Sequence, residues 1–430
     1  MNDLANFILH DPNAGIVTLG TMFIGLSAAV VGSFAFLRKR ALVGDAIAHA
    51  ILPGIALAFM ITQSKNPFIL MAGALVAGWV AMLLIEGITR NSKLKPDTSI
   101  GLILSVFFGF GILLLTSIQH SGAGNQAGLD QFLFGKAAAM RGSDLRAYSI
   151  VAGLLLITVV LFYKEFKLIS FNPEFARSRG LPVGALQFVL SSITVLAIAT
   201  GIQAVGVVLM AALLITPPAA ARAWTERLLV MLILAGVLGA LSGFIGSYIS
   251  YTAPQMPTGP WIVMSLSGMA LLSLFFAPER GVLSRIIRQQ QNRKKILSEN
   301  LLKALYHLRE RAMKEVFSRN EIRQERDFQV LEFNRAVGTL RTKLWVTEDQ
   351  KGIRLTDLGR EEARRVVRLH RLWEMYLTQR LRMKADHIHP NAETMEHIIT
   401  PELEEQLLRE LDYPSVDPHK SPIPYPERRK

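Results

Sequence analysis

An acid and a histidine lie four residues apart inside an apolar run that follows a basic triplet. Asp45 and His49 belong to the stretch LRKRALVGDAIAHAILPGIALAF, residues 37–59. On a helix this spacing places both side chains on one face, where a carboxylate oxygen and an imidazole nitrogen can bind a divalent cation. Each ionisable group at bilayer depth costs about 2.5 to 3.5 kcal/mol on insertion scales. The alternative is a charge pair near the membrane interface, stabilised by water or by its own two members.

A helix break follows this pair and favours the cation-binding interpretation. Pro53 and Gly54 come directly after the turn that carries His49. Broken helices are tolerated inside a membrane only where the backbone is buried in protein or lines a cavity. The chain has no cysteine, so any metal is held by oxygen and nitrogen ligands.

The charged residues divide the chain into two parts. Half of the 430 residues are hydrophobic, which is typical of a membrane protein, yet from Pro278 onward there are 31 Lys and Arg and 24 Asp and Glu. We expect an all-α polytopic membrane domain of eight or nine helices, followed by a mainly α cytoplasmic domain. The expected boundaries are 1–278 for the membrane domain, 279–297 for a basic linker, 298–356 for a winged-helix-like domain, and 357–430 for a last domain that carries candidate metal ligands.

Nine apolar runs are long enough to cross a bilayer, although the turn between the sixth and seventh is short. They lie near residues 16–37, 42–62, 67–89, 98–117, 144–163, 184–203, 205–221, 228–250 and 259–277. Successive connecting segments lie on opposite sides of the membrane. Those on one side carry twelve Lys and Arg in total, and those on the other side carry four. The positive-inside rule therefore predicts an outside N-terminus and a cytoplasmic C-terminal half.

One cytoplasmic connection, residues 164–182, has the signals of a short helix that contacts a partner. Asn172 can cap the helix, Pro173 suits its first position, Glu174 suits its positive end, and Gly180 stops it. Phenylalanines lie at its start and arginines at its end, which suits docking into a groove. The alternative is a helix on the membrane surface with its aromatic rings among the headgroups.

The stretch around Asp45, the SFNPEFARSRGLP loop and the later LLITPPAAARAW segment resemble the permease subunits of ATP-binding-cassette importers for manganese, zinc or iron. This resemblance covers about residues 10–278. It implies a translocation path past Asp45 and His49, a separate ATPase subunit, an extracytoplasmic metal-binding protein and a second permease subunit in a homo- or heterodimer of the bacterial inner membrane. The implied coupling helix comprises Phe171, Asn172, Pro173, Glu174, Phe175 and Arg177. The chain lacks a G-x-x-x-x-G-K-[ST] motif, so we expect it to bind no nucleotide.

The charged half has the element order of a winged helix. Leucines 301, 302, 305 and 308 predict a first helix, and two further helices are expected over residues 320–328 and 330–343. The segment LWVTEDQKGIRLTDLG then predicts a strand, a turn, a second strand and a helix that starts at Thr356. The basic stretch before these elements, residues 279–295, is a linker or a helical extension.

Histidines and glutamates recur at helical spacing in the last eighty residues. The candidates are His370, Glu374, His389, Glu393, Glu396 and His397. Spacings of three and four place such residues on one helix face, where imidazoles and carboxylates can bind one or two metal ions. The alternative is a solvated face of charge pairs.

This half resembles the iron- and manganese-dependent repressors related to the diphtheria toxin repressor, through RLTDLGREEARRVVRLHRLWEMYL, HPNAETMEHII and SPIPYP. The resemblance implies that His370, Glu374 and His389 match ligands of the iron-responsive branch. His370, Glu393, Glu396 and His397 match ligands of the manganese-responsive branch. Glu393 stands where the iron-responsive branch has cysteine, which favours manganese.

The resemblance also implies metal ligands and DNA contacts in the helices of the winged-helix part. The first-helix ligand positions correspond to Asn300 and Lys303; asparagine is a weaker ligand, and lysine repels a metal ion. Candidate contacts to DNA phosphates are Asn334, Arg335, Arg341 and Lys343. The net charge of +7 after Ala277 suits DNA and an anionic membrane surface alike.

Three functions compete at this point. The first is a metal-ion permease whose cytoplasmic domain senses the same ion and regulates transport or genes. The second, an intramembrane metal hydrolase, is disfavoured because the chain has no H-E-x-x-H motif. The third is a membrane-tethered transcriptional regulator, which proteolysis would release.

Overall fold

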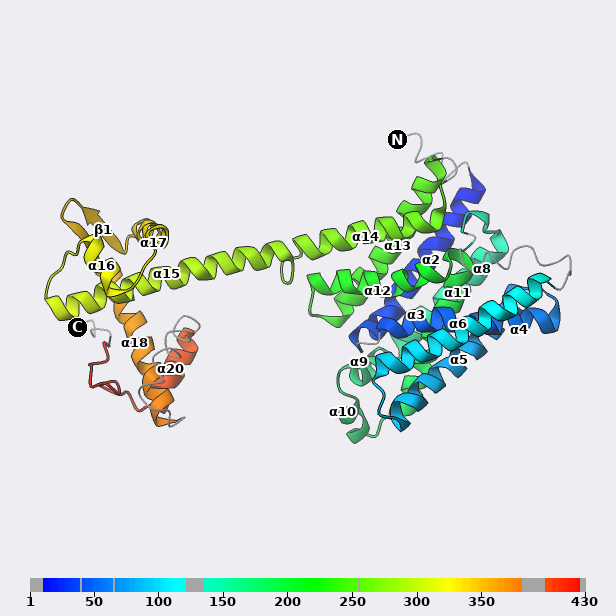
Figure 1. Cartoon of the computed structure of the whole chain (residues 1–430), viewed down its shortest axis with the longest axis horizontal. Coiled ribbons are helices and arrows are strands. Elements are labelled where there is room, and N and C mark those ends of the chain that lie inside the picture. The colour runs from blue at the N-terminus through cyan, green and yellow to red at the C-terminus, as the bar shows by residue number, and fades with distance from the viewer. Residues whose placement is uncertain are drawn as a thin grey trace. The chain divides into compact units, whose positions relative to one another are not determined.

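The computed structural model describes residues 11–38, 41–64, 66–120, 135, 137–253, 256–380 and 399–425. The chain divides after Arg285 into two compact units. The described part of the first unit is helical, and the second unit combines helices with one two-stranded sheet (Figure 1). This architecture confirms the expected fold class.

Eight helices in the described part of the first unit are long and apolar enough to cross a membrane. A ninth apolar helix, Leu209–Trp224, is shorter and covers most of the expected seventh span. The helices of this unit are α2 (Pro12–Leu37), α3 (Ala41–Ala50), α4 (Leu52–Thr62), α5 (Pro67–Asn91), α6 (Pro96–His120), the 3₁₀ turn η1 (Ala137–Ala139), α8 (Gly142–Leu161), α9 (Tyr163–Phe171), α10 (Pro173–Ser178), α11 (Val183–Val205), α12 (Val207–Trp224), α13 (Leu228–Thr252) and α14 (Thr258–Phe276). The second span is thus built from two consecutive helices, α3 and α4.

Glycines allow the helices of this bundle to approach at backbone distance. A Cβ atom added at Gly25 of α2 would lie 2.2 Å from the Gly239 carbonyl oxygen of α13. The same holds for Gly54 of α4, whose added Cβ would lie 2.1 Å from the Gly73 oxygen of α5. In a membrane, where the hydrophobic effect between helices is absent, such close approach supplies much of the packing energy.

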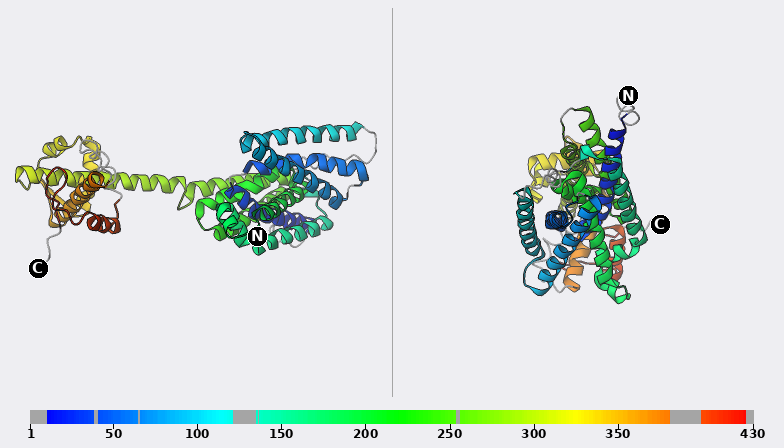
Figure 2. Two further views of the ribbon diagram at one scale, coloured as in Figure 1. Left: turned by 90° about the horizontal axis from the view of Figure 1, so that it is seen from below. Right: turned by 90° about the vertical axis from the view of Figure 1, so that its right-hand side faces the viewer.

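Helices α4, α5 and α6 pack side by side at one edge of the first unit (Figures 1 and 2). Helix α3 contacts α6, α12, α11 and α5, so it lies inside the bundle. Most residues of α3 from Val43 onward are buried. The acid and the histidine are therefore carried by an internal helix.

The second unit is a winged helix followed by a helical domain. Its elements are α15 (Val282–Ala312, which begins in the first unit), α16 (Arg319–Glu325), α17 (Val330–Thr342), β1 (Val346–Asp349), β2 (Gly352–Leu355), α18 (Asp357–Gln379) and α20 (Pro401–Glu410). The expected linker is helical from Val282. Leu301 and Leu305 of the first predicted helix are buried in one core with Phe333 of α17 and Ile353 of β2.

The predicted hairpin and helix start are present. Strands β1 and β2 pair antiparallel, with Val346 opposite Leu355. The Asp349 carboxylate accepts hydrogen bonds from the backbone N–H groups of Lys351 (2.8 Å) and Gly352 (3.1 Å). Thr356 caps α18 by accepting a hydrogen bond from the Gly359 N–H at 3.0 Å, which satisfies one of the free donors at the helix start.

Candidate functional site

The structure brings Asp45 and His49 together on α3. The Nε2 atom of His49 lies 3.7 Å from Oδ1 of Asp45, and the side chains are 21% and 42% exposed, respectively. The α-helical spacing of four residues predicts this geometry. The pair is therefore partly accessible although its helix is internal to the bundle.

One nitrogen of His49 has no partner. Its Nδ1 atom is buried without a hydrogen bond to any residue that the structure describes. The ring packs edge-on against Phe108 of α6, with the ring centroids 4.9 Å apart. Buried polar atoms are nearly always hydrogen-bonded, so this imidazole nitrogen is an exception among the described residues.

The helix break lies directly after the histidine. Helix α3 ends at Ala50 and α4 begins at Leu52, with Pro53 in its first turn. Because proline has no N–H, it cannot donate to the carbonyl oxygen four residues earlier, which is that of His49. The break thus leaves a backbone oxygen beside the pair without its usual helical donor.

Contacts with α12 position α3, and the sequence did not reveal them. A Cβ atom added at Gly44 would lie 2.4 Å from Cδ2 of Leu214, and one added at Gly32 of α2 would lie 2.0 Å from the Leu214 carbonyl oxygen. Leu214 precedes Pro217 and Pro218, which lie inside α12. The glycine before Asp45 therefore lets α3 pack against a proline-containing helix. The only sequence signal was the glycine itself and the Pro-Pro pair.

The expected coupling segment forms a short helix, α10, directly after α9. The Asn172 side chain accepts a hydrogen bond from the Phe175 N–H at 3.0 Å and caps α10, and Gly180 follows in a left-handed conformation at φ +77°. Phe171 and Phe175 are exposed, and the guanidinium of Arg179 lies over the Phe175 ring. Pro173, Glu174 and Arg177 lie on this turn, the last two exposed.

Buried residues fix this turn to the bundle. Phe166 of α9 is fully buried and packs edge-on against Phe34 of α2, with centroids 5.7 Å apart. Ala176 is also fully buried and belongs to the same core cluster. A turn anchored by buried residues thus exposes two aromatic rings, and aromatic side chains are frequent anchors at protein interfaces.

In the second unit, His370 and Glu374 form a closed pair on α18. His370 Nε2 lies 3.2 Å from Glu374 Oε1, and the side chains are only 4% and 2% exposed. His307 of α15 lies nearby, and burial, followed by the charge of Lys303, lowers its pKa to about 4. His307 is therefore neutral at physiological pH. The other expected ligands, His389, Glu393, Glu396 and His397, lie outside the described residues.

The described residues fit a metal ion in part. Within the described ranges no group of three His, Cys, Asp or Glu could hold one. The buried His370–Glu374 pair supplies a nitrogen and an oxygen, and Asn300 Oδ1 is buried without a hydrogen-bond partner in the same ranges. Lys303 is also buried, at 4% exposure. Its ammonium opposes a cation, so the first-helix position of Lys303 does not fit a metal ligand.

The candidate DNA contacts on and after α17 have different surroundings. Asn334 accepts a hydrogen bond from Arg319 at 2.8 Å, and Arg341 pairs with Glu348 at 3.4 Å. The ammonium of Lys343 lies 4.3 Å from the centre of the Trp345 ring. Arg335 is exposed and lines a cleft between α15 and α17.

Family descriptions match both units. The ABC 3 transport family matches residues 13–277. The metal binding and dimerisation domain of iron dependent repressors matches residues 356–425. These matches confirm the two resemblances drawn from the sequence.

Individual relatives agree with the family matches. The manganese transport system membrane protein MntC of Bacillus subtilis is 40% identical over 377 residues, which are 87% of this chain and 86% of that protein. The zinc transport system membrane protein TroC of Treponema pallidum is 44% identical over 278 residues, 64% of this chain and 92% of that protein.

A solved structure gives the same result. PsaBC from Streptococcus pneumoniae in complex with Fab matches with a TM-score of 0.59 and 30% identity over 67% of this chain and 99% of that chain. Together with the apolar helices, the matches place the chain among multi-pass membrane proteins of transporters rather than among enzymes. The chain belongs to the ABC 3 transport family and carries a C-terminal domain of the iron dependent repressor type.

Proposed function

We propose that this chain is the permease subunit of an ATP-binding-cassette importer for a divalent transition-metal ion, Mn, Zn or Fe, and that Asp45 and His49 bind the ion on its path. The observation that carries the proposal is a partly exposed carboxylate and imidazole, 3.7 Å apart, beside a helix break. The named functions of the manganese and zinc relatives support this substrate class.

Two donors from one chain leave the coordination sphere of a divalent ion incomplete. A second permease subunit, either another copy of this chain or a sister subunit, supplies further ligands in this proposal. In a homodimer two pairs give two carboxylates and two imidazoles, a set that accepts Mn, Zn or Fe. The ion crosses by exchanging water for these ligands and then leaving them.

A separate ATPase subunit drives this exchange through the turn at α10. The exposed rings of Phe171 and Phe175 enter a groove of the ATPase, and the buried Phe166 and Ala176 transmit its movement to the bundle. An extracytoplasmic metal-binding protein delivers the ion to the opposite side of the bacterial inner membrane. The second unit is cytoplasmic in this arrangement, as the distribution of Lys and Arg predicts.

The second unit regulates the importer or its genes. We propose domain boundaries at 278, 297 and 356, with metal held between His370, Glu374 and the ligands expected at 389, 393, 396 and 397. A bound metal ion would hold α18, which carries His370 and Glu374, together with the segment that carries the other expected ligands. A second candidate function, a regulator released by proteolysis that binds DNA, is favoured by the exposed Arg335 on α17.

Uptake of radioactive Mn, Zn and Fe by vesicles with the assembled importer tests the transport proposal. The double variant Asp45→Asn, His49→Gln should lose uptake of the preferred ion, because removal of both donors costs at least the ~10- to 100-fold that second-shell changes cost at metal sites. The matched control is Asp97→Asn, His120→Gln, which changes the same residue types at the two ends of α6. Normal uptake by the first variant, or equal loss in the second, would contradict the proposal.

Co-purification of the ATPase tests the coupling helix. Phe171→Ala with Phe175→Ala should weaken ATPase association at least ~10-fold, since buried aromatic anchors at interfaces are worth 2 kcal/mol or more. Phe110→Ala, an exposed phenylalanine of α6, serves as the control. Retention of the ATPase by the double variant would assign the turn to the membrane surface instead.

A further inference from the structure

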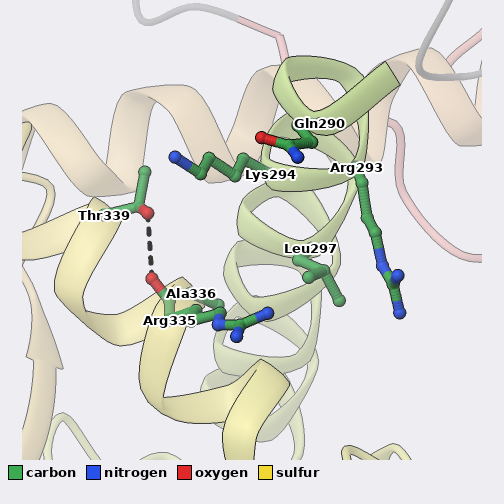
Figure 3. Close-up of a pocket in the computed structure, with 7 residues that line it drawn as sticks. All are labelled: Gln290, Arg293, Lys294, Leu297, Arg335, Ala336 and Thr339. Carbon is green, nitrogen blue, oxygen red and sulfur yellow. Dashed lines mark hydrogen bonds between the residues drawn. The ribbon is translucent and has the colours of Figure 1, made fainter. Parts of the chain in front are cut away.

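A cleft of about 450 Å³ lies between α15 and α17 in the second unit (Figure 3). It is formed by residues other than the proposed metal ligands. Four lining residues come from α15 and three from α17: Gln290, Arg293, Lys294, Leu297, Arg335, Ala336 and Thr339. Its volume lies within the ~300 to 1,000 Å³ usual for small-molecule sites.

The helical spacing of these residues explains why they share one cleft. Gln290, Lys294 and Leu297 follow one another at intervals of four and three, so they lie along one face of α15. Arg335 and Thr339 are four apart on α17, where the Thr339 hydroxyl donates to the Arg335 carbonyl oxygen at 2.9 Å. Two facing helices thus present their side chains to the same space.

The charge in the cleft is positive. Arg293 pairs with Glu332 at 2.5 Å. Lys294 and Arg335 form no ion pair or side-chain hydrogen bond with any residue in the described ranges, and both are exposed. Two cations that face one cavity without counter-charges repel each other, so the cleft favours an anion.

The remaining lining residues suit a small organic anion better than a bare ion. Leu297 and Ala336 provide an apolar wall, and the Gln290 side chain offers an amide donor and acceptor. Sites for small ligands combine apolar walls with a few polar groups that fix orientation. Arginine and lysine together suit a phosphate, because the guanidinium fork matches its oxygens and the ammonium adds a point charge.

We propose that this cleft binds a phosphate-bearing small molecule, whose phosphate is held by Lys294 and Arg335. The ligand bridges α15, which connects the two units in sequence, with α17, the third helix of the winged helix. It also occupies Arg335, a candidate DNA contact. Binding of the small molecule and of a DNA phosphate to Arg335 are therefore mutually exclusive.

Calorimetric titration of the full chain in phosphatidylcholine nanodiscs, with inorganic pyrophosphate as the probe, tests this proposal. Lys294→Gln and Arg335→Gln should each weaken binding about tenfold, because one charge-assisted hydrogen bond is lost. Lys294→Glu should abolish binding, because its carboxylate repels the phosphate. The matched control is Arg288→Gln, which removes an exposed cation of α15 that does not line the cleft. It should change the dissociation constant less than twofold.

The second arm of the experiment uses a fluorescent DNA duplex of random sequence. Pyrophosphate should displace any bound duplex from the wild-type chain but not from the Lys294→Glu variant. The proposal is overturned if pyrophosphate does not bind, if Arg288→Gln weakens binding as much as Lys294→Gln, or if only the duplex requires Arg335. None of these readouts depends on uptake, so the result is separate from that of the transport proposal.

Discussion

The two units each carry an acid and a histidine four residues apart on a helix, but they present these pairs to different environments. In the first unit the two groups are 3.7 Å apart, with the carboxylate 42% exposed. In the second unit His370 and Glu374 are 3.2 Å apart and at most 4% exposed. Identical helical spacing therefore yields one open and one closed pair.

Under the function proposed above, the two pairs have different tasks although they share the same residue types. An ion that crosses a membrane must bind and leave quickly, which requires access and loose geometry. A regulatory ion is held while the protein stays in one state, which suits burial among other ligands. The open pair is therefore suited to transport and the closed pair to structural control.

The largest expected effect is a contrast between the histidines of the two pairs: exchange of His49 should affect metal uptake, and exchange of His370 should affect stability. His49→Gln should lower metal uptake at least ~10- to 100-fold, because even second-shell changes cost that much at metal sites, while leaving the melting temperature of the chain within about 2 °C. The same exchange at His370 removes no ligand from the path, so the importer should still transport the ion, and the melting temperature of the second unit should fall. If both variants lose uptake and keep their stability, the comparison fails.

Removal of one member of the closed pair should lower the stability of the second unit. Glu374→Ala should destabilise the second unit by roughly 1–3 kcal/mol, because it leaves the buried imidazole of His370 without the carboxylate that faces it. The control is Glu405→Ala, which breaks the exposed pair with Arg409 on α20 and should cost less than about 1 kcal/mol. Denaturation followed by tryptophan fluorescence measures both, and equal losses would show that the burial of the pair has no consequence.

The buried lysine should weaken metal binding to the closed site. Lys303→Glu removes a positive charge and adds a carboxylate, so Mn²⁺ affinity should rise roughly 10- to 100-fold, as expected for unit charges several ångströms apart at an effective dielectric near 20. Titration calorimetry on a chain that also carries Asp45→Asn and His49→Gln isolates this site. Lys351→Glu, in the exposed hairpin turn, is the control. Unchanged affinity in Lys303→Glu would place the ammonium away from the ion.

The smallest expected effect concerns pH. Burial and the nearby Lys303 lower the pKa of His307 to about 4, below its ordinary value of 6.5. Between these values the unfolded chain binds a proton that the folded chain does not, so stability falls as the pH drops from about 6.5 to 4. The loss should be roughly 1–3 kcal/mol and should be reduced in His307→Gln. A pH-independent midpoint in wild type would contradict this.

Local patterns predicted the elements that depend on neighbouring residues. Eight of the nine expected spans, the break after His49, the cap at Asn172 and the hairpin at Asp349 all follow from hydrophobic periods and turn chemistry, which act within a few residues. The shared face of Asp45 and His49 follows from the same geometry. Such features require no knowledge of tertiary packing.

Contacts between distant elements were beyond the sequence. Two contacts join elements far apart in the chain: the approach of Gly44 to Leu214, and the cleft shared by Lys294 and Arg335. The burial of Lys303 also depends on elements distant in the sequence. Arg319 also pairs with Glu348 and Asn334, which gives a candidate DNA contact an internal partner. Helical spacing fixes a face but not what lies opposite it.

Electron paramagnetic resonance of bound Mn²⁺ tests the central claim most directly. The sample is the assembled importer whose chain carries His370→Gln, His389→Gln and His397→Gln, so that His49 is the remaining expected imidazole ligand. We predict a nitrogen coupling to the Mn²⁺ electron spin that disappears when His49→Gln is added. A coupling that survives this exchange, or a wild-type path that shows none, would contradict the assignment of His49 as a ligand of the transported ion.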